Sequence, residues 1–210
     1  MRKHRMGGVV SAVALGLGVV GGLTWSATAI AQSSAGAATY AADVVHSTVM
    51  FQIRHAGVTN FYGRFNDFTG SFSLNEENPA ASRFDFTIQL ESVDTGSNGR
   101  DDHLRSPDFF NVTQFPTSSF KSTNVRKTGE DTYEVTGELN LHGVTKPITA
   151  TVTHTGTGTF RNKDVKGIEA VFQIKRSEFG ITNYLAPDGG EGGGIGNTVT
   201  ITVAVEGVKQ

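Results

Sequence analysis

The sequence contains no cysteine among its 210 residues. This absence excludes disulfide bonds, thiolate metal sites, a cysteine nucleophile and a lipid attached to cysteine. A domain with this composition must therefore be held together by its hydrophobic core, and the chain is long enough to form one such core.

The motifs of several common active sites are also missing. Five histidines follow residue 31: His46, His55, His103, His142 and His154. They show neither His-x-His nor His-Glu-x-x-His spacing, so a metal site would need distant strands to converge. No Gly-x-Ser-x-Gly nucleophile elbow occurs. We therefore predict no metal, no cofactor and no catalytic residue.

Residues 177–196 hold seven of the 26 glycines. Their glycine-rich part, 189–196, leads into a predicted strand, whereas a phosphate-binding loop leads into a helix. We interpret residues 177–196 as a long mobile loop that acts as a flexible lid.

The first 31 residues have the three parts of a secretory signal peptide. A basic start at residues 2–5 is followed by an apolar run over 7–23 and by the small-residue site Ala29-Ile30-Ala31. A transmembrane anchor is the alternative, but the run has only 17 residues and six of them are glycine. We predict an exported protein, periplasmic or secreted, with a disordered leader over 32–39 and one domain over 40–210.

The charge of the mature chain is negative. Loss of Arg2, Lys3 and Arg5 with the signal peptide leaves 15 Lys and Arg against 20 Asp and Glu, a net charge of −5. This balance argues against nucleic acid as a partner and against docking on anionic lipid through a basic patch. We expect a soluble protein without stable membrane insertion, and the sequence is compatible with a monomer or a homodimer.

Apolar and polar residues alternate through most of the domain. Residues 83–90 are the clearest case, because a period of two over eight residues indicates one buried and one solvated face. The pattern predicts eight strands, at 47–54, 68–74, 83–90, 117–125, 133–141, 148–152, 168–174 and 198–205.

The connections between these strands are mostly of hairpin length, which favours an antiparallel sheet, and residues 155–166 read as a polar loop. An eight-stranded sheet with one apolar face must close or fold over to bury that face. We predict an all-β fold, an eight-stranded antiparallel β-barrel, with a β-sandwich as the alternative.

One stretch, residues 94–120, breaks the alternation. Charged residues cluster at 100–105, and four phenylalanines follow by residue 120. Ser106 and Pro107 are typical of a helix N-cap and first helical position, and Pro116 returns the chain to an extended form. We predict one short helical excursion between strands, beginning at Ser106.

Several motifs, in the same order, resemble those of the YceI-like family. They are His46-Ser47-x-Val49-x-Phe51-x-Ile53-x-His55, then Arg100-Asp101-x-His103-Leu104-x-Ser106 with Phe109-Phe110-Asn111-Val112-x-x-Phe115-Pro116, then Leu139-x-Leu141-x-Gly143-Val144-Thr145-Lys146-Pro147, and Arg176-Ser177-Glu178-Phe179-Gly180-Ile181. The resemblance spans about residues 40–208, although Asn111 and Asn197 stand where the family often has an acid. It implies a lipocalin-like barrel, exported to the periplasm, that encloses a polyisoprenoid or isoprenoid-quinone chain.

Strand parity places nine apolar side chains on the inner wall of the predicted barrel: Phe51, Ile53, Phe84, Phe86, Ile88, Phe120, Phe172, Ile174 and Ile201. These side chains either line an elongated cavity or form a solid core. The resemblance favours a cavity that binds the isoprenoid chain.

Arg100 and His103 are candidate contacts for the polar head of such a lipid at the barrel mouth. Two other interpretations stay open for the cluster at 100–105. It is either acid–base machinery, or a structural set in which Arg100 and Arg105 pair with nearby aspartates.

We expect a non-enzymatic binding protein that encloses a long isoprenoid lipid as a carrier or buffer. A lipid chain in a membrane is already desolvated, so its transfer into the barrel involves a small net free energy, which suits exchange. The alternatives are an enzyme acting on an apolar substrate with His103 as acid or base, and an interaction protein whose barrel core is filled.

Overall fold

The computed structural model describes residues 37–210, so the predicted signal peptide (1–31) and residues 32–36 of the predicted leader lie outside the described residues. The described strands are β1 (Thr39–Ala42), β2 (Thr48–His55), β3 (Thr59–Phe65), β4 (Phe68–Ser73), β5 (Arg83–Gln89), β6 (Val93–Asp94), β7 (Thr117–Lys127), β8 (Thr132–Leu141), β9 (Val144–Phe160), β10 (Lys163–Lys175) and β11 (Ile195–Lys209). The described helices are α1 (Asn98–Arg105) and the 3-10 helices η1 (Pro79–Ala81), η2 (Leu90–Ser92) and η3 (Arg176–Phe179). Within residues 37–210, no helix has the length and apolar character needed to cross a membrane.

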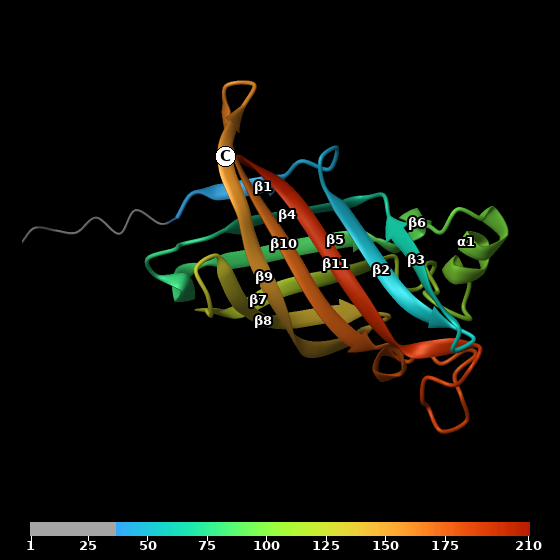
Figure 1. Cartoon of the computed structure of the whole chain (residues 1–210). Helices are drawn as coiled ribbons and strands as arrows, with labels where there is room; N and C mark the ends of the chain where they lie inside the picture. The colour runs from blue at the N-terminus through green and yellow to red at the C-terminus, as the bar shows by residue number, and fades with distance from the viewer. Residues whose placement is uncertain (1–36) are drawn as a thin grey trace, which may run out of the picture. The chain divides into compact units, whose positions relative to one another are not determined.

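Eight strands form a closed ring of antiparallel neighbours, in the order β1, β4, β5, β7, β8, β9, β10 and β11. The short strand β1 closes the ring, because Tyr40 pairs with Phe72 on β4 and with Lys209 on β11 (Figure 1). Closure removes the exposed edges that an open sheet would have. The predicted eight-stranded antiparallel barrel is therefore confirmed.

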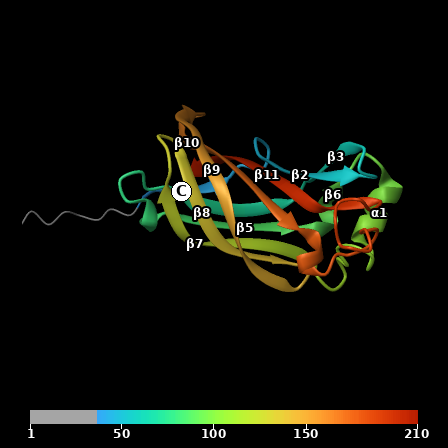
Figure 2. The ribbon, with the colours of Figure 1, turned by 60° about the horizontal axis from the view of Figure 1, so that its bottom comes forward.

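Three further strands, β2, β3 and β6, extend the sheet at one end of the ring. β11 pairs with β1 near its C-terminus and with β2 over most of its length, and β3 pairs with both β2 and β6. Figures 1 and 2 place β3, β6 and α1 together at this end, which we call the α1 end. We call the opposite end, where β1 lies, the β1 end.

The strands β1, β3 and β6 were not predicted from the alternation of apolar and polar residues. β1 has four residues and β6 has two, which is too short for a period of two to stand out. In β3, Gly63 replaces an apolar side chain on the buried face.

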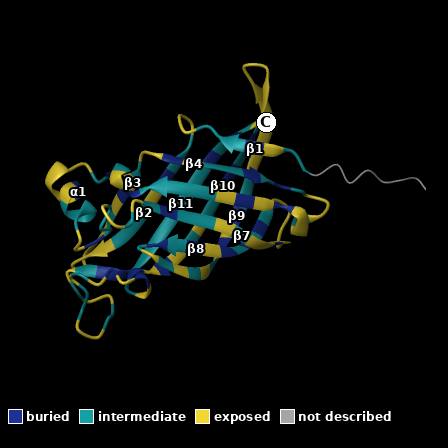
Figure 3. Cartoon of the chain, turned by 180° about the vertical axis from the view of Figure 1, so that it is seen from behind, coloured by how far each residue is buried: buried dark blue, intermediate teal, exposed yellow. Residues whose placement is uncertain are grey.

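The polar loop predicted at 155–166 is wrong. β9 continues to Phe160 and β10 begins at Lys163, with Arg161 and Asn162 between them at φ values of 49° and 62°. Two left-handed residues make the hairpin turn whose twist matches that of the strands. Residues 155–160 are exposed, as Figure 3 shows, so this part of the strand has no apolar face to reveal it.

Within the described residues a single α-helix interrupts the strands, as predicted. It begins at Asn98 and ends at Arg105, so the predicted start at Ser106 is wrong. Its first turn is closed by the Arg100 and Asp101 N–H groups, which donate to the Ser97 carbonyl. Ser106 follows the helix as its C-cap. Pro107 comes directly after this cap, a common place for proline because it cannot continue a helix.

Buried side chains fill the β1 end of the barrel. Tyr40, Phe72 and Phe84 form a stack with ring centroids 5.6 and 6.0 Å apart. The Lys166 ammonium lies beside them and donates to Glu76 Oε1 at 2.9 Å. The β1 end is therefore closed by packed side chains, and the space inside the barrel lies toward the α1 end.

Candidate functional site

Two cavities lie inside the barrel. The larger, of about 300 Å³, is at the α1 end, and the smaller, of about 70 Å³, reaches toward the β1 end. We call them the mouth cavity and the deep cavity. They share six wall residues: Val49, Ile88, Ser118, Leu139, Phe172 and Ile201. Because they share these walls, we treat them as two parts of one elongated lumen.

All eleven predicted site residues line this lumen. The mouth cavity is lined by Phe51, Ile53, Ile88, Arg100, His103, Phe172, Ile174 and Ile201. The deep cavity is lined by Phe84, Phe86 and Phe120, together with Ile88, Phe172 and Ile201. Ligand contact at these residues stays a prediction.

The lumen changes in polarity along its length. Of the described residues that line the deep cavity, only Ser118 and Ser119 have polar side chains. The mouth cavity has six polar side chains in its wall: His55, Arg100, His103, Ser118, Arg176 and Tyr184. Among residues 37–210, no Asp or Glu lines either cavity. The polar groups at the mouth are therefore hydroxyls or basic side chains, and the interior is apolar.

Arg100 reaches the mouth cavity from the first turn of α1. Its Nε and Nη2 donate to the side chain and the carbonyl of Thr95, each at 2.7 Å. Its guanidinium lies 4.3 Å from the centre of the Phe61 ring, within the range of a cation–π contact. No ion pair joins Arg100 to an aspartate within residues 37–210, so the predicted pairing is wrong for this residue. Arg100 projects from α1 toward β3, so its guanidinium contacts the Phe61 ring and not an aspartate.

His103 lies one turn further along α1. Its Nε2 is 2.9 Å from Asp108 Oδ2, so the ring donates to a carboxylate outside the cavity wall. The edge of the ring meets Phe109, with centroids 5.1 Å apart, and Tyr184, with centroids 6.2 Å apart. His103 is therefore held between the turn after α1 and the loop before β11.

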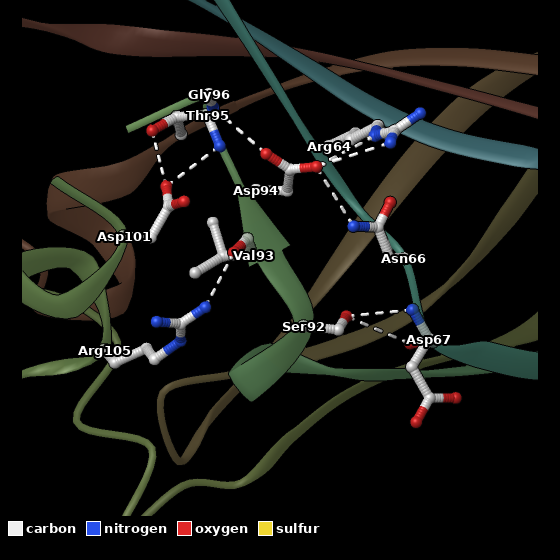
Figure 4. A network of polar contacts seen from close by, with 10 residues as sticks. All are labelled: Arg64, Asn66, Asp67, Ser92, Val93, Asp94, Thr95, Gly96, Asp101 and Arg105. Atoms are coloured by element: carbon white, nitrogen blue, oxygen red, sulfur yellow. Dashed lines mark hydrogen bonds and ion pairs between the residues drawn. The ribbon is translucent and has the colours of Figure 1, made fainter. Parts of the chain in front are cut away.

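The rest of the charged cluster attaches α1 to the strands (Figure 4). Asp101 is buried and accepts hydrogen bonds from the backbone N–H and hydroxyl of Thr95. Arg105 donates to Asp102 at 2.9 Å and to the carbonyls of Glu91 and Val93. The structural interpretation is therefore confirmed for Arg105.

Figure 4 also shows how Asp94 holds the strand that precedes α1. Its carboxylate accepts hydrogen bonds from the Gly96 N–H, from Asn66 and from Arg64. These contacts, led by the Gly96 bond, lower the pKa of Asp94 below its ordinary value of 3.8. The base of α1 is thus fixed by an ionised carboxylate on β6.

Arg176 reaches the mouth cavity from η3 and is only 4% exposed. It donates to the carbonyls of Ile181, Ile195 and Gly196 at 2.8–3.0 Å. Burial lowers the pKa of this guanidinium below its ordinary value. Arg176 thereby ties both ends of the loop over 181–196 to one point.

Further hydrogen bonds hold the same loop against the barrel. Glu191 accepts from the N–H of Asn197 and from the N–H and hydroxyl of Thr198. The Ala56 N–H, in the β2–β3 turn, donates to the Gly194 carbonyl at 2.9 Å. The loop predicted as a flexible lid is therefore bonded to two different parts of the α1 end.

Several residues that line the mouth cavity were not among those predicted from the sequence. Leu139, Leu141 and Val199 have the same strand parity as the predicted wall residues, so the pattern could have identified them. Ile181 and Tyr184 lie in the irregular loop before β11, where no period indicates which side chains face inward.

One further cluster within residues 37–210 has metal-ligand side chains. His46 Nδ1 lies 3.0 Å from Asp43 Oδ2 and 3.9 Å from Glu206 Oε1, at the β1 end. The hydrogen bond from His46, followed by that from the Val45 N–H, lowers the pKa of Asp43 below its ordinary 3.8. None of the three residues lines the lumen.

Comparison with known sequences identifies close relatives. The family model of the YceI-like domain matches residues 40–207 of the chain. Protein YceI of Shigella flexneri is 42% identical over 193 residues, covering 90% of this chain and 96% of the relative. A UPF0312 protein of Pectobacterium carotovorum subsp. carotovorum is 43% identical over 166 residues, covering 79% of this chain and 82% of that protein.

Solved structures share the fold. BcnA of Burkholderia cenocepacia has a TM-score of 0.70 at 22% identity, covering 79% of this chain and 98% of BcnA. A polyisoprenoid binding domain of Saccharophagus degradans has a TM-score of 0.61 at 17% identity, covering 81% of this chain and 98% of the domain. At these identities the likeness is one of fold.

Proposed function

Because the chain belongs to the YceI-like family, we propose that it binds a long isoprenoid lipid in its lumen. The ligand is a polyisoprenoid or an isoprenoid quinone. The protein acts as a carrier or buffer for this lipid and not as an enzyme. The related domain of Saccharophagus degradans, which is a polyisoprenoid binding domain, supports this assignment.

The change in polarity along the lumen carries the proposal. An isoprenoid lipid has a long apolar chain with a polar group at one end, and the lumen has an apolar interior with polar side chains at one end. The mouth cavity, at about 300 Å³, falls at the lower end of the range of about 300–1,000 Å³ for ligand pockets.

The polar groups at the mouth suit a head that accepts hydrogen bonds. Arg100 has an Nη1 group with no hydrogen-bond partner within residues 37–210, and Tyr184 brings a hydroxyl to the same cavity. In the part of the chain that the structure describes, no carboxylate lines the wall to bind a cationic head. A quinone carbonyl or a phosphate therefore fits this end better than an amine does.

The free energy of lipid transfer favours a protein that exchanges its lipid over an enzyme that reacts with it. A lipid chain is already desolvated in a bilayer, so its transfer to an apolar lumen involves a small difference between two favourable states. The Ser118 hydroxyl, which both cavities share, donates to the Asn140 carbonyl at 2.8 Å and has no histidine partner within residues 37–210. That arrangement does not support a serine nucleophile in the lumen, since an activated hydroxyl needs a base in contact.

Native mass spectrometry of protein purified from cells tests the proposal. We expect an adduct with the mass of an isoprenoid lipid, which organic extraction removes and which returns on incubation with the extracted lipid. A protein that carries no adduct and takes up none from lipid extracts would contradict lipid binding.

We also propose that the protein is exported before it acts. Cleavage after Ala31 would leave a mature chain that begins near Gln32. The intact mass of the protein in periplasmic extract or culture medium measures this start. Recovery of a chain that retains residues 1–31 in the membrane fraction would refute the prediction.

A further inference from the structure

We infer that glycines facing the lumen set the width of the lipid chain that it accepts, and that Gly63 is the most direct determinant. They do so by letting phenylalanine rings lie flat against the wall. The inference rests on the proposed lipid-binding function and adds a selectivity to it: methyl-branched chains fit because these glycines are present.

Gly63 on β3 lies directly opposite Phe51 on β2, so both residues face the lumen. Gly63 is buried, and the Phe51 ring covers the place that a side chain would take. A Cβ at this position would lie 3.0 Å or less from three atoms of the ring, closer than such contacts normally occur. Because there is no Cβ, the ring can lie along the wall of the mouth cavity.

The same arrangement recurs on two other strand pairs. Gly70 on β4 pairs with Phe86 on β5, and Gly137 on β8 lies against the Phe120 ring on β7. Both rings line the deep cavity. Recurrence at three places, in both cavities, indicates that the recessed rings are a property of the lumen and not of one strand.

Gly63 offers the cleanest test of the three positions. A Cβ at Gly70 would also meet a backbone carbonyl of β5, and a Cβ at Gly137 would meet one of β7, so alanine there would displace a strand. At Gly63 the three nearest atoms all belong to the Phe51 ring. A side chain turns more easily than a hydrogen-bonded strand pair separates.

The displaced ring has one direction in which to move. The Phe65 ring lies beside it, with centroids 5.7 Å apart, and the β2–β3 ladder lies behind it. The ring therefore turns into the mouth cavity and narrows it. A chain with methyl branches is wider than a straight chain, so the narrowing should affect an isoprenoid more.

Competition binding tests this selectivity. Purified, delipidated protein is loaded with the fluorescent probe 1-anilinonaphthalene-8-sulfonate, which is displaced by farnesol (branched) or by 1-dodecanol (straight, with the same main-chain length). We expect Gly63→Ala to weaken farnesol binding by about tenfold, the scale of discrimination by one methyl-sized clash, and dodecanol binding far less. The control is Gly99→Ala, because a Cβ at this position on α1 meets no atom within 4 Å.

A second substitution guards against a simple loss of folding. In Phe51→Leu/Gly63→Ala the smaller side chain leaves room for the new methyl group, so farnesol binding should return. Phe51→Leu alone should raise the preference for farnesol over dodecanol. The inference would be overturned if Gly63→Ala lost affinity for both alcohols equally or for neither. It would also be overturned if the double variant did not recover its affinity for farnesol.

The two proposals fail in different ways. If the parent protein binds both alcohols and Gly63→Ala does the same, the width determinant is wrong while lipid binding stands. If the parent binds neither alcohol and carries no lipid, the proposed function is wrong. The width determinant then fails with it. In a protein that does bind lipid, the crystal structure of Gly63→Ala is an independent check, since a Phe51 ring in its original position would overturn the inference.

Discussion

Arg176 carries a buried positive charge that is surrounded by peptide carbonyls. A buried charge is costly unless it is well hydrogen-bonded, and the planar guanidinium meets this need by donating to Ile181, Ile195 and Gly196 at once. This single side chain thus positions the loop that brings Tyr184 to the mouth cavity.

Arg176→Lys should destabilise the protein by about 1.5–3 kcal/mol, because an ammonium keeps the charge but cannot reproduce the fork of donors. Denaturant unfolding measures the loss, and amide exchange over residues 181–195 should become faster. Arg126→Lys is the matched control, since Arg126 is an exposed residue paired with Glu134. Equal changes in stability for the two variants would contradict this role of Arg176.

Glu76 and Lys166 form a pair whose contribution depends on pH. The hydrogen bond from Lys166 lowers the pKa of Glu76 below its ordinary 4.5, although burial opposes the shift. A depressed carboxyl pKa in the folded state means stability that is present above 4.5 and lost as the pH falls through the lowered pKa.

Glu76→Gln should therefore lower the Tm at pH 7 by about 2–4 °C, as expected for a pair with one exposed partner, and the difference should vanish in acid. Thermal unfolding of both proteins between pH 7 and pH 2 checks this. A Tm difference of the same size across that whole range would show that the charge of Glu76 is not responsible.

At the scale of elements, the turn after α1 joins the helix to the barrel interior. Phe109 is 5% exposed and belongs to the same buried cluster as Leu139 and Ile174, whereas Phe110 is partly buried and contacts Phe65. The two adjacent rings therefore have different surroundings, although the sequence pattern does not distinguish them.

Phe109→Ala should cost about 3–5 kcal/mol of unfolding free energy, and Phe110→Ala should cost less, because the cost of removing a ring rises with its burial. Chemical denaturation of the two variants compares them directly. Melting of both within about 2 °C of the parent would mean that this segment does not cap the mouth cavity.

At the scale of the whole molecule, the lumen is either a ligand-binding cavity or an imperfectly packed core. Substitution of a wall residue by tryptophan distinguishes these two possibilities. Ile88 lines both cavities, while Ile174 lines the mouth cavity alone. If lipid fills the lumen, Ile88→Trp and Ile174→Trp should remain folded and lose the co-purified lipid, because the added ring occupies the space of the chain.

In a solid core the same changes are overpacking and would cost about 1–3 kcal/mol. Native mass spectrometry and thermal unfolding together measure both quantities. Val171→Trp, on the outer face of β10, is the control that should keep its lipid. Destabilised variants of a parent that never carried lipid would leave only a packed barrel.

The sequence by itself determined which side chains face inward. Successive residues of a strand point to opposite faces, so parity is a local property that needs no knowledge of the strand's neighbours. For this reason Phe51, Ile88 and Phe172, with the rest of the predicted wall, line the lumen. The negative charge and the missing cysteine are likewise properties of composition alone.

Only the tertiary structure decided how the barrel closes and where its space lies. Closure depends on β1, a four-residue strand whose partners near Phe72 and Lys209 are far along the chain. The recess of Phe51 depends on Gly63 across a strand pair, and Tyr184 reaches the mouth through a loop without a period. These features arise from contacts between residues distant in sequence, which no local pattern of apolar and polar residues encodes.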